Sequence, residues 1–314
     1  MNRTVTVGTR GSQLALWQAD HVSAALVAAV PGLVLGREII KTQGDKILDV
    51  PLSRIGDRGL FVKEIEEALL AGRIDLAVHS LKDLPTAQPE KLAIACVMAR
   101  VDARDCLVSP QYASMADLPA NAVVGTSSLR RKAQLKAHYP GWQFKDVRGN
   151  LQTRLDKLDR GEYDALILAC AGLDRLGLGD RIAERIPFHI CLPAVGQGAL
   201  AIETRDDDAE LMAWLVPLED AATRACITAE RALLSKLEGG CQVPIGAQGR
   251  VDGDVLHLEG VVASLDGERV LRASAEGPVA EAVEIGRRVA AELLRQGGDA
   301  ILASIRAEAD VASA

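Results

Sequence analysis

The sequence predicts an α/β protein with two doubly wound lobes and a small C-terminal α+β domain. Three observations predict this fold class. A strand, a Val-Gly-Thr turn and a helix occupy residues 4–31 and recur from residue 122. A Gly-x-x-Asp return from helix to strand follows at Gly72 and again at Gly161. Later in the chain, Asp-Gly pairs between alternating apolar runs indicate hairpins. Alternating strands and helices favour parallel sheets with helices on both faces, although chance similarity between two α/β units would also explain the repeat.

The elements of each part follow from the same patterns. The first lobe is predicted to contain strands over 4–7 and 75–78 and an amphipathic helix over 59–72. The second is predicted to contain strands over 122–124 and 164–168 around two helices. In the last third, helices are expected over 221–237 and 279–294, with hairpin turns at Asp252-Gly253 and Asp266-Gly267. A strand from Ala199 is expected to return to the first lobe. The expected domains are therefore 1–99 with 200–217, 100–199, and 218–314.

The composition excludes several classes of partner. The net charge of −7 argues against a nucleic-acid or anionic-membrane binder, and 3% aromatic residues are too few for base-stacking platforms. The 6 cysteines show no Cys-x-x-Cys and no ligand-like spacing with histidine. No apolar run resembles a signal core or reaches the length of a membrane span. We expect a cytoplasmic protein without a metal site, and a monomer because nothing in the sequence requires an oligomer.

Anion-binding side chains gather where the predicted strands end. Helix N-termini offer free backbone N–H groups, and guanidinium forks add directed donors. Ligands of open α/β sheets bind at the carboxyl ends of the strands. The sequence lacks phosphate-binding glycine loops, so separated arginines favour a ligand with several carboxylates. Solvated helix charges paired with Asp or Glu are the alternative. The residues concerned are Arg10, Ser12, Thr126, Ser127, Ser128, Arg130, Arg131, Arg148, Arg154 and Arg175.

A carboxylate accompanies these cations. Lys82 and Asp83 belong to the segment His79–Pro85, which directly follows the predicted strand over 75–78, so both would reach the same cleft. In basic surroundings, the Asp83 carboxylate could stabilise a cationic transition state and exchange protons with a leaving amine. An ordinary turn aspartate shortly before Pro85 is the alternative interpretation.

Residues 42–59 are predicted to form a mobile lid. The segment has few apolar anchors and several glycines, and its second half contains the cations Arg54 and Arg58. An ordinary disordered surface loop explains the same composition equally well.

Cys241 is the candidate site of covalent attachment. It follows Gly239 and Gly240 and precedes Pro244, so its loop cannot continue the preceding helix. Glycines let other atoms approach the backbone, which presents the thiol. A small buried hydrophobic residue at a turn is the alternative.

Together these motifs resemble the porphobilinogen deaminase family, also called hydroxymethylbilane synthases, over essentially the whole chain. The resemblance is specific because many motifs occur in the same order. They are Val7–Ser12, His79–Pro85, Val124–Arg131, Arg148–Asn150, Leu192–Gly198 and Leu237–Cys241.

The resemblance implies a fold, a cofactor and a reaction. It implies three domains, the first two similar to the lobes of type II periplasmic binding proteins. It also implies a dipyrromethane cofactor attached to Cys241 through a thioether. On this primer, the family's transferase activity adds four porphobilinogen units with loss of ammonia each time. Hydrolysis then releases hydroxymethylbilane for haem and tetrapyrrole biosynthesis.

The resemblance also implies residue roles. Asp83 matches the family's catalytic aspartate. The residues implied to bind the cofactor are Lys82, Thr126, Ser127, Ser128, Arg130 and Arg131. Those implied to bind substrate or the growing chain are Arg10, Ser12, Arg148, Arg154, Arg175 and Gln197. Many family members have lysines in the lid where this chain has Arg54 and Arg58, which preserves charge but changes size and geometry.

Two other function classes compete with this interpretation. A two-lobed binding or sensor protein for a polycarboxylate would explain the lobes and the arginines, but not the Gly-Gly-Cys loop or the third domain. A nucleotide-dependent α/β enzyme would need the phosphate loops that the sequence lacks. A covalent pyrrole on Cys241 would separate the deaminase from both.

Overall fold

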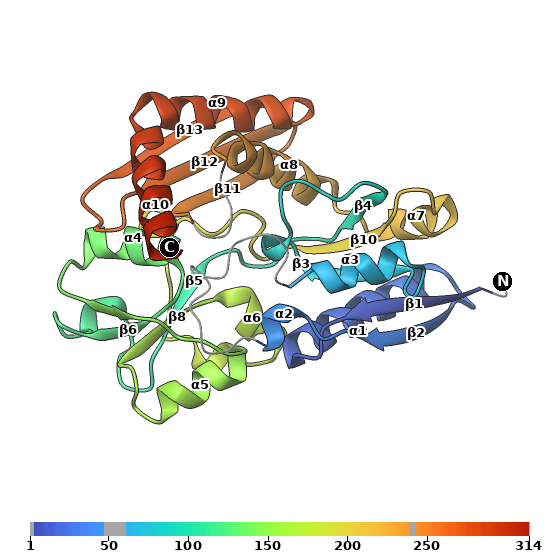
Figure 1. Cartoon of the computed structure of the whole chain (residues 1–314), viewed down its shortest axis with the longest axis horizontal. Helices are drawn as coiled ribbons and strands as arrows, with labels where there is room; N and C mark the ends of the chain where they lie inside the picture. Colours follow the sequence, from blue (N-terminus) through green and yellow to red (C-terminus); the bar gives the residue numbers. More distant parts are fainter. Residues whose placement is uncertain (1–2, 47–60, 239–242, 314) are drawn as a thin grey trace. The chain divides into compact units, whose positions relative to one another are not determined.

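The computed structural model describes residues 3–46, 61–238 and 243–313 (Figure 1). These residues group into two compact units. The first contains the described chain up to Val101 together with Ala199–Arg224. The second contains Asp102–Gly198 and the described chain from Ala225 onward. The three-domain boundaries expected from the sequence stay a prediction.

The first unit contains a five-stranded sheet in the order β2-β1-β3-β10-β4. β1 pairs in parallel with β2 and β3, whereas β10 runs antiparallel to β3 and β4. The sheet is therefore mixed, where the sequence predicts a parallel one. β10 differs because it enters from a distant part of the chain and needs no crossover helix. The strands are β1 (Thr4–Thr9), β2 (Val34–Ile39), β3 (Leu76–Ser80), β4 (Leu92–Val97) and β10 (Leu200–Arg205).

Helices cover both faces of this sheet. Successive side chains of a strand point to opposite faces. Leu76 and Val78 accordingly share one buried core with α1, while Ala77 shares a second with α3. The helical segments are α1 (Gln13–Ala29), α2 (Gln43–Lys46), α3 (Lys63–Leu70), η2 (Leu81–Asp83), α7 (Ala209–Leu215) and η5 (Val216–Leu218).

The second unit repeats this layout. Its sheet has the order β7-β6-β8-β5-β9, with β6 parallel to its neighbours and β5 antiparallel to β8 and β9. In both sheets three parallel strands stand next to one antiparallel strand, which pairs on its other side with the edge strand. The predicted fold class is confirmed. The strands are β5 (Asp105–Val108), β6 (Val123–Gly125), β7 (Gln143–Lys145), β8 (Ala165–Ala169) and β9 (Glu184–Arg185).

Two cores again lie on the two faces of this second sheet. Ile167 of β8 packs with Leu135 of α4, whereas the next residue, Leu168, packs with Leu155 of α5. The lobe is therefore doubly wound. The helical segments are η3 (Met115–Asp117), α4 (Leu129–His138), α5 (Leu151–Asp159), α6 (Cys170–Arg175) and η4 (Gly179–Arg181).

The remainder of the second unit is an α+β region. Its three strands form an antiparallel meander, and the turns contain Gly253 and Gly267 with φ of 59° and 78°. These are the predicted Asp-Gly hairpins. Leu233, Leu258 and Leu293 join helices and sheet in one core. The segments are α8 (Ala221–Lys236), β11 (Ile245–Asp252), β12 (Val255–Ala263), β13 (Val270–Pro278), η6 (Val279–Glu281), α9 (Ala282–Arg295) and α10 (Gly298–Ser313).

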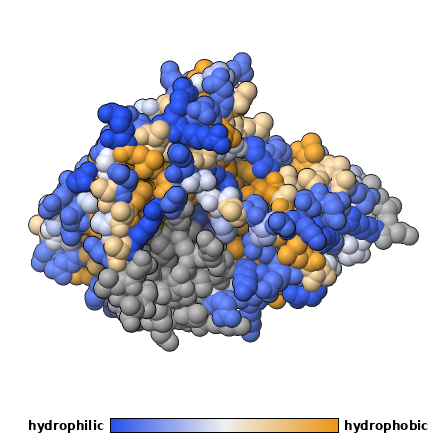
Figure 2. Space-filling model, turned by 45° about the horizontal axis from the view of Figure 1, so that its top comes forward, coloured by the Kyte–Doolittle hydropathy of each residue, from blue (hydrophilic) through white to orange (hydrophobic). Residues whose placement is uncertain are grey.

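The face shown in Figure 2 is mostly hydrophilic, with apolar residues in groups between hydrophilic ones. Such scattered apolar exposure is normal for a globular protein. Across the described ranges, no helix combines the length and hydropathy that a membrane span needs.

Helices α8 and α9 approach closely at Gly286. A Cβ added there would lie 2.2 Å from the Ala229 carbonyl oxygen and 3.0 Å from Leu233 N. We expect Gly286→Ala to lower the free energy of unfolding by about 1–3 kcal/mol, because backbone cannot yield as a side chain can. Arg287→Ala, on an exposed position of the same helix, should be nearly neutral. Chemical denaturation measures both, and a Gly286→Ala protein as stable as the parent would contradict the close approach.

Candidate active site

Three hydroxyl side chains hold the turn between β6 and α4. Ser128 caps α4, where its Oγ accepts a hydrogen bond from Arg131 N at 3.4 Å. Ser127 Oγ donates to the Val147 carbonyl at 2.9 Å and accepts from Val147 N at 3.0 Å. Thr126 is buried, and its Oγ1 accepts from Ser128 N at 3.3 Å. These hydroxyls therefore fix the backbone from which the α4 arginines project.

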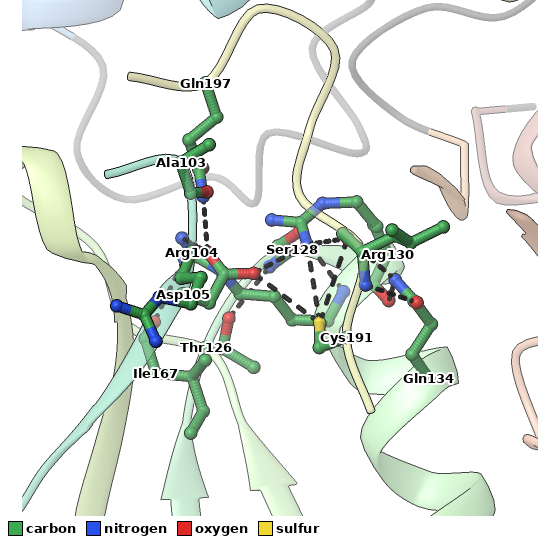
Figure 3. Close-up of polar contacts among 12 residues, drawn as sticks. Ala103, Arg104, Asp105, Thr126, Ser128, Arg130, Gln134, Ile167, Cys191 and Gln197 are labelled. Carbon is green, nitrogen blue, oxygen red and sulfur yellow. Dashed lines mark hydrogen bonds and ion pairs between the residues drawn. The ribbon is translucent and has the colours of Figure 1, made fainter. Parts of the chain in front are cut away.

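The Asp105 carboxylate binds both of these arginines, and Figure 3 shows its place beside Arg130. Arg130 Nη1 donates to Asp105 Oδ2 at 2.6 Å. Arg131 donates to Oδ1 from Nε at 3.0 Å and from Nη2 at 2.7 Å. Asp105 is 0% exposed, Arg130 4% and Arg131 7%. The two arginines thus form a buried ion-paired cluster and are not solvated charges on a helix surface.

This buried cluster carries more positive than negative charge. Burial alone would raise the pKa of Asp105, but the charges and hydrogen bonds of Arg130 and Arg131 hold it well below its usual value. Two guanidinium groups then face one carboxylate. Among the described residues, Arg130 makes its hydrogen bonds through Nη1 only, to Asp105, Cys191 and the Leu192 carbonyl. The N–H groups of its Nε and Nη2 can therefore donate hydrogen bonds to a further anion.

Gln197 and Arg175 lie in the same unit. Gln197 Nε2 donates to Asp105 Oδ1 and to the Ala103 carbonyl, both at 2.8 Å. Arg175 Nη2 donates to the Gly198 carbonyl at 2.8 Å. Within the described chain, no carboxylate pairs with Arg175, and its burial lowers the pKa to about 10. A buried guanidinium without an anionic partner suits an anionic ligand.

Arg148 and Arg154 lie at the N-terminal end of α5. Asn150 caps this helix by accepting a hydrogen bond from Thr153 N at 2.9 Å. Arg154 Nε donates to the Gly149 carbonyl at 2.9 Å, where the backbone has a φ of 110°. The structure therefore places both arginines at a helix N-terminus, where anions are favoured.

In the first unit, the turns after β1 and β3 lie at the same edge of the sheet, because these parallel strands are neighbours. Ser12 caps α1, and its Oγ accepts from Ala15 N at 3.3 Å. Lys82 and Asp83 lie on η2, which directly follows β3, and both are half-buried. The structure thus brings the first helix start and the Lys82–Asp83 turn to one edge.

Arg10 already has an anionic partner at this edge. Its guanidinium donates to both carboxylate oxygens of Asp45 and lies 4.3 Å above the Phe61 ring. Burial would raise the pKa of Asp45, but hydrogen bonds from Arg10 and Thr42 lower it overall. A ligand carboxylate would have to compete with Asp45 for Arg10.

Some of the expected residues lie outside the described part of the chain. These are Cys241 and the two lid cations, Arg54 and Arg58. The structure also shows two arginine partners, Asp105 and Asp45, that the sequence analysis does not identify. The one signal for Asp105 is its place before the apolar run Cys106–Val108, because a charged residue in a buried strand needs a partner. The described residues contain no His, Cys, Asp and Glu group able to hold a metal ion.

Comparison with known proteins identifies the family. The family model for the porphobilinogen deaminase dipyromethane cofactor binding domain matches residues 5–213, and that for the porphobilinogen deaminase C-terminal domain matches residues 224–295. The chain belongs to the porphobilinogen deaminase family. It is therefore a transferase of tetrapyrrole biosynthesis with a dipyrromethane cofactor binding domain.

Curated porphobilinogen deaminases match nearly the whole chain. The protein from Desulforudis audaxviator is 55% identical over 309 residues, covering 98% of this chain and 100% of the relative. That from Bordetella parapertussis is 52% identical over 301 residues, covering 96% of each. That from a Synechococcus strain is 54% identical over 303 residues, covering 95% of this chain and 96% of the relative.

Solved structures show more distant likenesses. A nutrient binding protein from Burkholderia cenocepacia bound to methionine has a TM-score of 0.43 at 13% identity and covers 68% of this chain and 90% of its own. The periplasmic VFT2 domain of Bordetella pertussis BvgS has a TM-score of 0.40 at 16% identity and covers 68% and 85%.

The second unit fits the porphobilinogen deaminase cofactor chemically. A dipyrromethane of this family bears acetate and propionate side chains, so it is a polycarboxylate. Arg130 presents unused donors beside a cluster with surplus positive charge. Forked guanidinium donors on rigid elements are the groups that bind carboxylates well.

Proposed function

We propose that this protein deaminates porphobilinogen and joins four molecules head to tail on a dipyrromethane primer. Hydrolysis then releases hydroxymethylbilane. The observation that carries the proposal is the surplus of buried guanidinium groups in a protein of net charge −7. Arg130 and Arg131 share one carboxylate, and Arg175 has none among the described residues. Such a cluster favours a ligand that supplies several carboxylates.

The cofactor is proposed to be attached to Cys241 through a thioether. When bound, it supplies the pyrrole primer on which the chain grows. The residues proposed to hold its carboxylates are Lys82, Thr126, Ser127, Ser128, Arg130 and Arg131. Their hydroxyl, ammonium and guanidinium groups are all hydrogen-bond donors. The hydroxyls at the start of α4 also keep the backbone of this helix terminus in place.

Asp83 is proposed as the catalytic residue. Its half-buried carboxylate lies on a short turn fixed to the end of β3. There it accepts a hydrogen bond from the pyrrole N–H of the substrate and stabilises the positive charge that develops as ammonia leaves. Before ammonia leaves, the protonated form of the same carboxyl group gives its proton to the amine, and the carboxylate that results then stabilises the positive charge.

Substrate carboxylates are proposed to bind a second set of donors, in which each arginine can take one carboxylate. Arg10 must exchange its Asp45 partner for the ligand, so its contribution should be smaller than that of Arg175. Arg54 and Arg58 are proposed to act as lid cations. The full donor set is Arg10, Ser12, Arg148, Arg154, Arg175 and Gln197. We also propose a cytoplasmic monomer without a nucleic-acid partner, supported by the acidic composition.

Intact mass and peptide mapping test the proposed function. The purified protein should carry the added mass of two linked pyrrole units on the peptide that contains Cys241. Cys241→Ser should lose this mass, because serine cannot form the thioether. Cys226→Ala, at a cysteine only 5% exposed, should keep it.

Incubation with porphobilinogen completes the test. The mass of the parent protein should grow in single pyrrole steps, up to four added units. An unmodified Cys241 together with no growth would refute the proposal. Binding of porphobilinogen without any growth would instead support a two-lobed binding protein.

A further inference from the structure

A buried ion pair lies close to the proposed catalytic turn in the chain. His79 Nε2 and Glu203 Oε2 are 3.1 Å apart, joining β3 to β10. His79 is 5% exposed and Glu203 is 0% exposed. With its ring proton on Nε2, His79 donates this hydrogen bond to the Glu203 carboxyl oxygen. Nothing in the deaminase proposal above uses either residue.

The pair has a third, acidic neighbour. Glu66 of α3 has its pKa raised, first by burial and then by the charge of Glu203, with His79 opposing the shift. Glu67 contributes a smaller effect in the same direction as Glu203. Oε1 of Glu66 and Oε1 of Glu203 are both buried, and neither has a hydrogen-bond partner in the described structure. A buried carboxylate oxygen without a partner is costly, so the remaining contact of Glu203, between its Oε2 and His79, matters more to the pair.

The chain leads directly from this pair to Asp83. Ser80 Oγ accepts a hydrogen bond from Gln18 Nε2 at 2.8 Å, and Gln18 is 3% exposed on α1. Leu81 N donates to the Ala199 carbonyl at 3.1 Å. Three successive residues, His79 to Leu81, are therefore each held by a polar contact, two of them to the 199–203 segment and one to α1. The turn η2 begins at Leu81, the last of these three residues.

We propose that His79 and Glu203 are positioning residues for the Lys82–Asp83 turn. Neither positioning residue touches substrate; each acts on Asp83 through the turn that follows β3. Glu203 Oε2 holds the His79 side chain, and His79 is the fourth residue before Asp83 in the chain. The consequence for turnover rests on the proposed function of Asp83.

A double variant separates positioning from simple stability. Removing one partner of a buried pair is strongly destabilising, whereas replacing both by apolar residues is often neutral. We therefore expect His79→Leu/Glu203→Leu to fold with near-parent stability and to keep its cofactor mass. Its kcat should fall about tenfold or more, because small displacements of a catalytic group cost that much. KM for porphobilinogen should change little in the double variant. The single variant His79→Gln keeps an N–H donor, so it should retain most of the parent kcat.

A second readout requires no turnover. Amide hydrogen exchange at Leu81 and Leu84, whose N–H groups donate to Ala199 and Leu81 carbonyls, should be faster in the double variant. Val22→Ala, at a fully buried α1 position, is the control that destabilises the lobe without touching the pair. It should lower stability while leaving kcat and the exchange at Leu81 and Leu84 close to parent values.

Each outcome decides the proposal. Unchanged kcat or unchanged exchange in the folded double variant would overturn it, as would an equal loss of kcat in Val22→Ala. If the parent protein neither carries pyrrole mass nor consumes porphobilinogen, the proposed function fails instead. The exchange measurement still tests whether His79 and Glu203 hold the turn.

Discussion

Asp83→Asn is expected to lower kcat by about 10²- to 10⁴-fold, the range typical of a lost general acid or base. Asparagine keeps the shape of the side chain but cannot carry the negative charge or transfer the proton. The turn η2 should persist, because its tie to Ala199 and its internal hydrogen bond are made by the backbone. Initial rates of porphobilinogen consumption, combined with the intact mass of each preparation, measure the effect.

The cofactor mass makes this prediction specific. Asp83→Asn should keep the two pyrrole units, because the proposed holding groups are other residues. Glu90→Gln removes an exposed carboxylate a few residues away and should leave both rate and mass unchanged. A near-parent rate in Asp83→Asn would remove Asp83 from the catalytic role. Loss of the cofactor mass would place Asp83 in cofactor loading instead.

The repeat of the two lobes can be predicted from sequence for two reasons. Its motifs are short and local in the chain, and packing favours the same residues in both lobes. Both strand-to-helix turns contain Val-Gly-Thr. A Cβ added at Gly8 would lie 2.2 Å from Ile74, and one added at Gly125 would lie 2.4 Å from Leu166. A larger residue at either position would therefore force the neighbouring Ile74 or Leu166 side chain to shift. Local pattern and tertiary packing agree, so the prediction of two doubly wound lobes is confirmed.

The direction of a strand within its sheet depends on pairing between distant segments. Local periodicity in the sequence does not predict this direction. Ala201 pairs with His79 and Cys106 pairs with Leu168, both antiparallel. These pairings make both sheets mixed. The same limit applies to the acidic partners of the arginines. The sequence shows that cations recur at strand ends, but not that Asp105 binds two of them or that Asp45 binds Arg10.

Asp105→Asn is expected to lower the free energy of unfolding by about 3–5 kcal/mol, the usual cost of removing one partner from a buried ion pair. Asparagine has nearly the same shape, so packing changes little. The two guanidinium groups of Arg130 and Arg131 lose their shared carboxylate while remaining buried. The amide NH₂ also faces donors with which it cannot bond. Cofactor content should fall with stability, because the arginines lose their fixed positions.

Asp102→Asn is the matched control. Asp102 also binds two arginines, Arg104 and Arg185, but its side chain is 21% exposed. Solvent therefore weakens each charge interaction, and we expect a loss of no more than about 1 kcal/mol. Denaturant unfolding of both variants at neutral pH measures the difference. Equal losses would show that burial of the Asp105 cluster does not determine its contribution.

The stability difference between parent and Asp105→Asn should depend on pH in a defined direction. In the folded protein the pKa of Asp105 lies well below its unfolded value of 3.8. The stabilisation by the ionised carboxylate is therefore fully present above the unfolded pKa and is lost as pH falls toward the folded pKa. The parent should keep its advantage constant near neutral pH and lose it progressively below about pH 4. An advantage that is equally large in strong acid would mean that the carboxylate charge does not stabilise the two arginines.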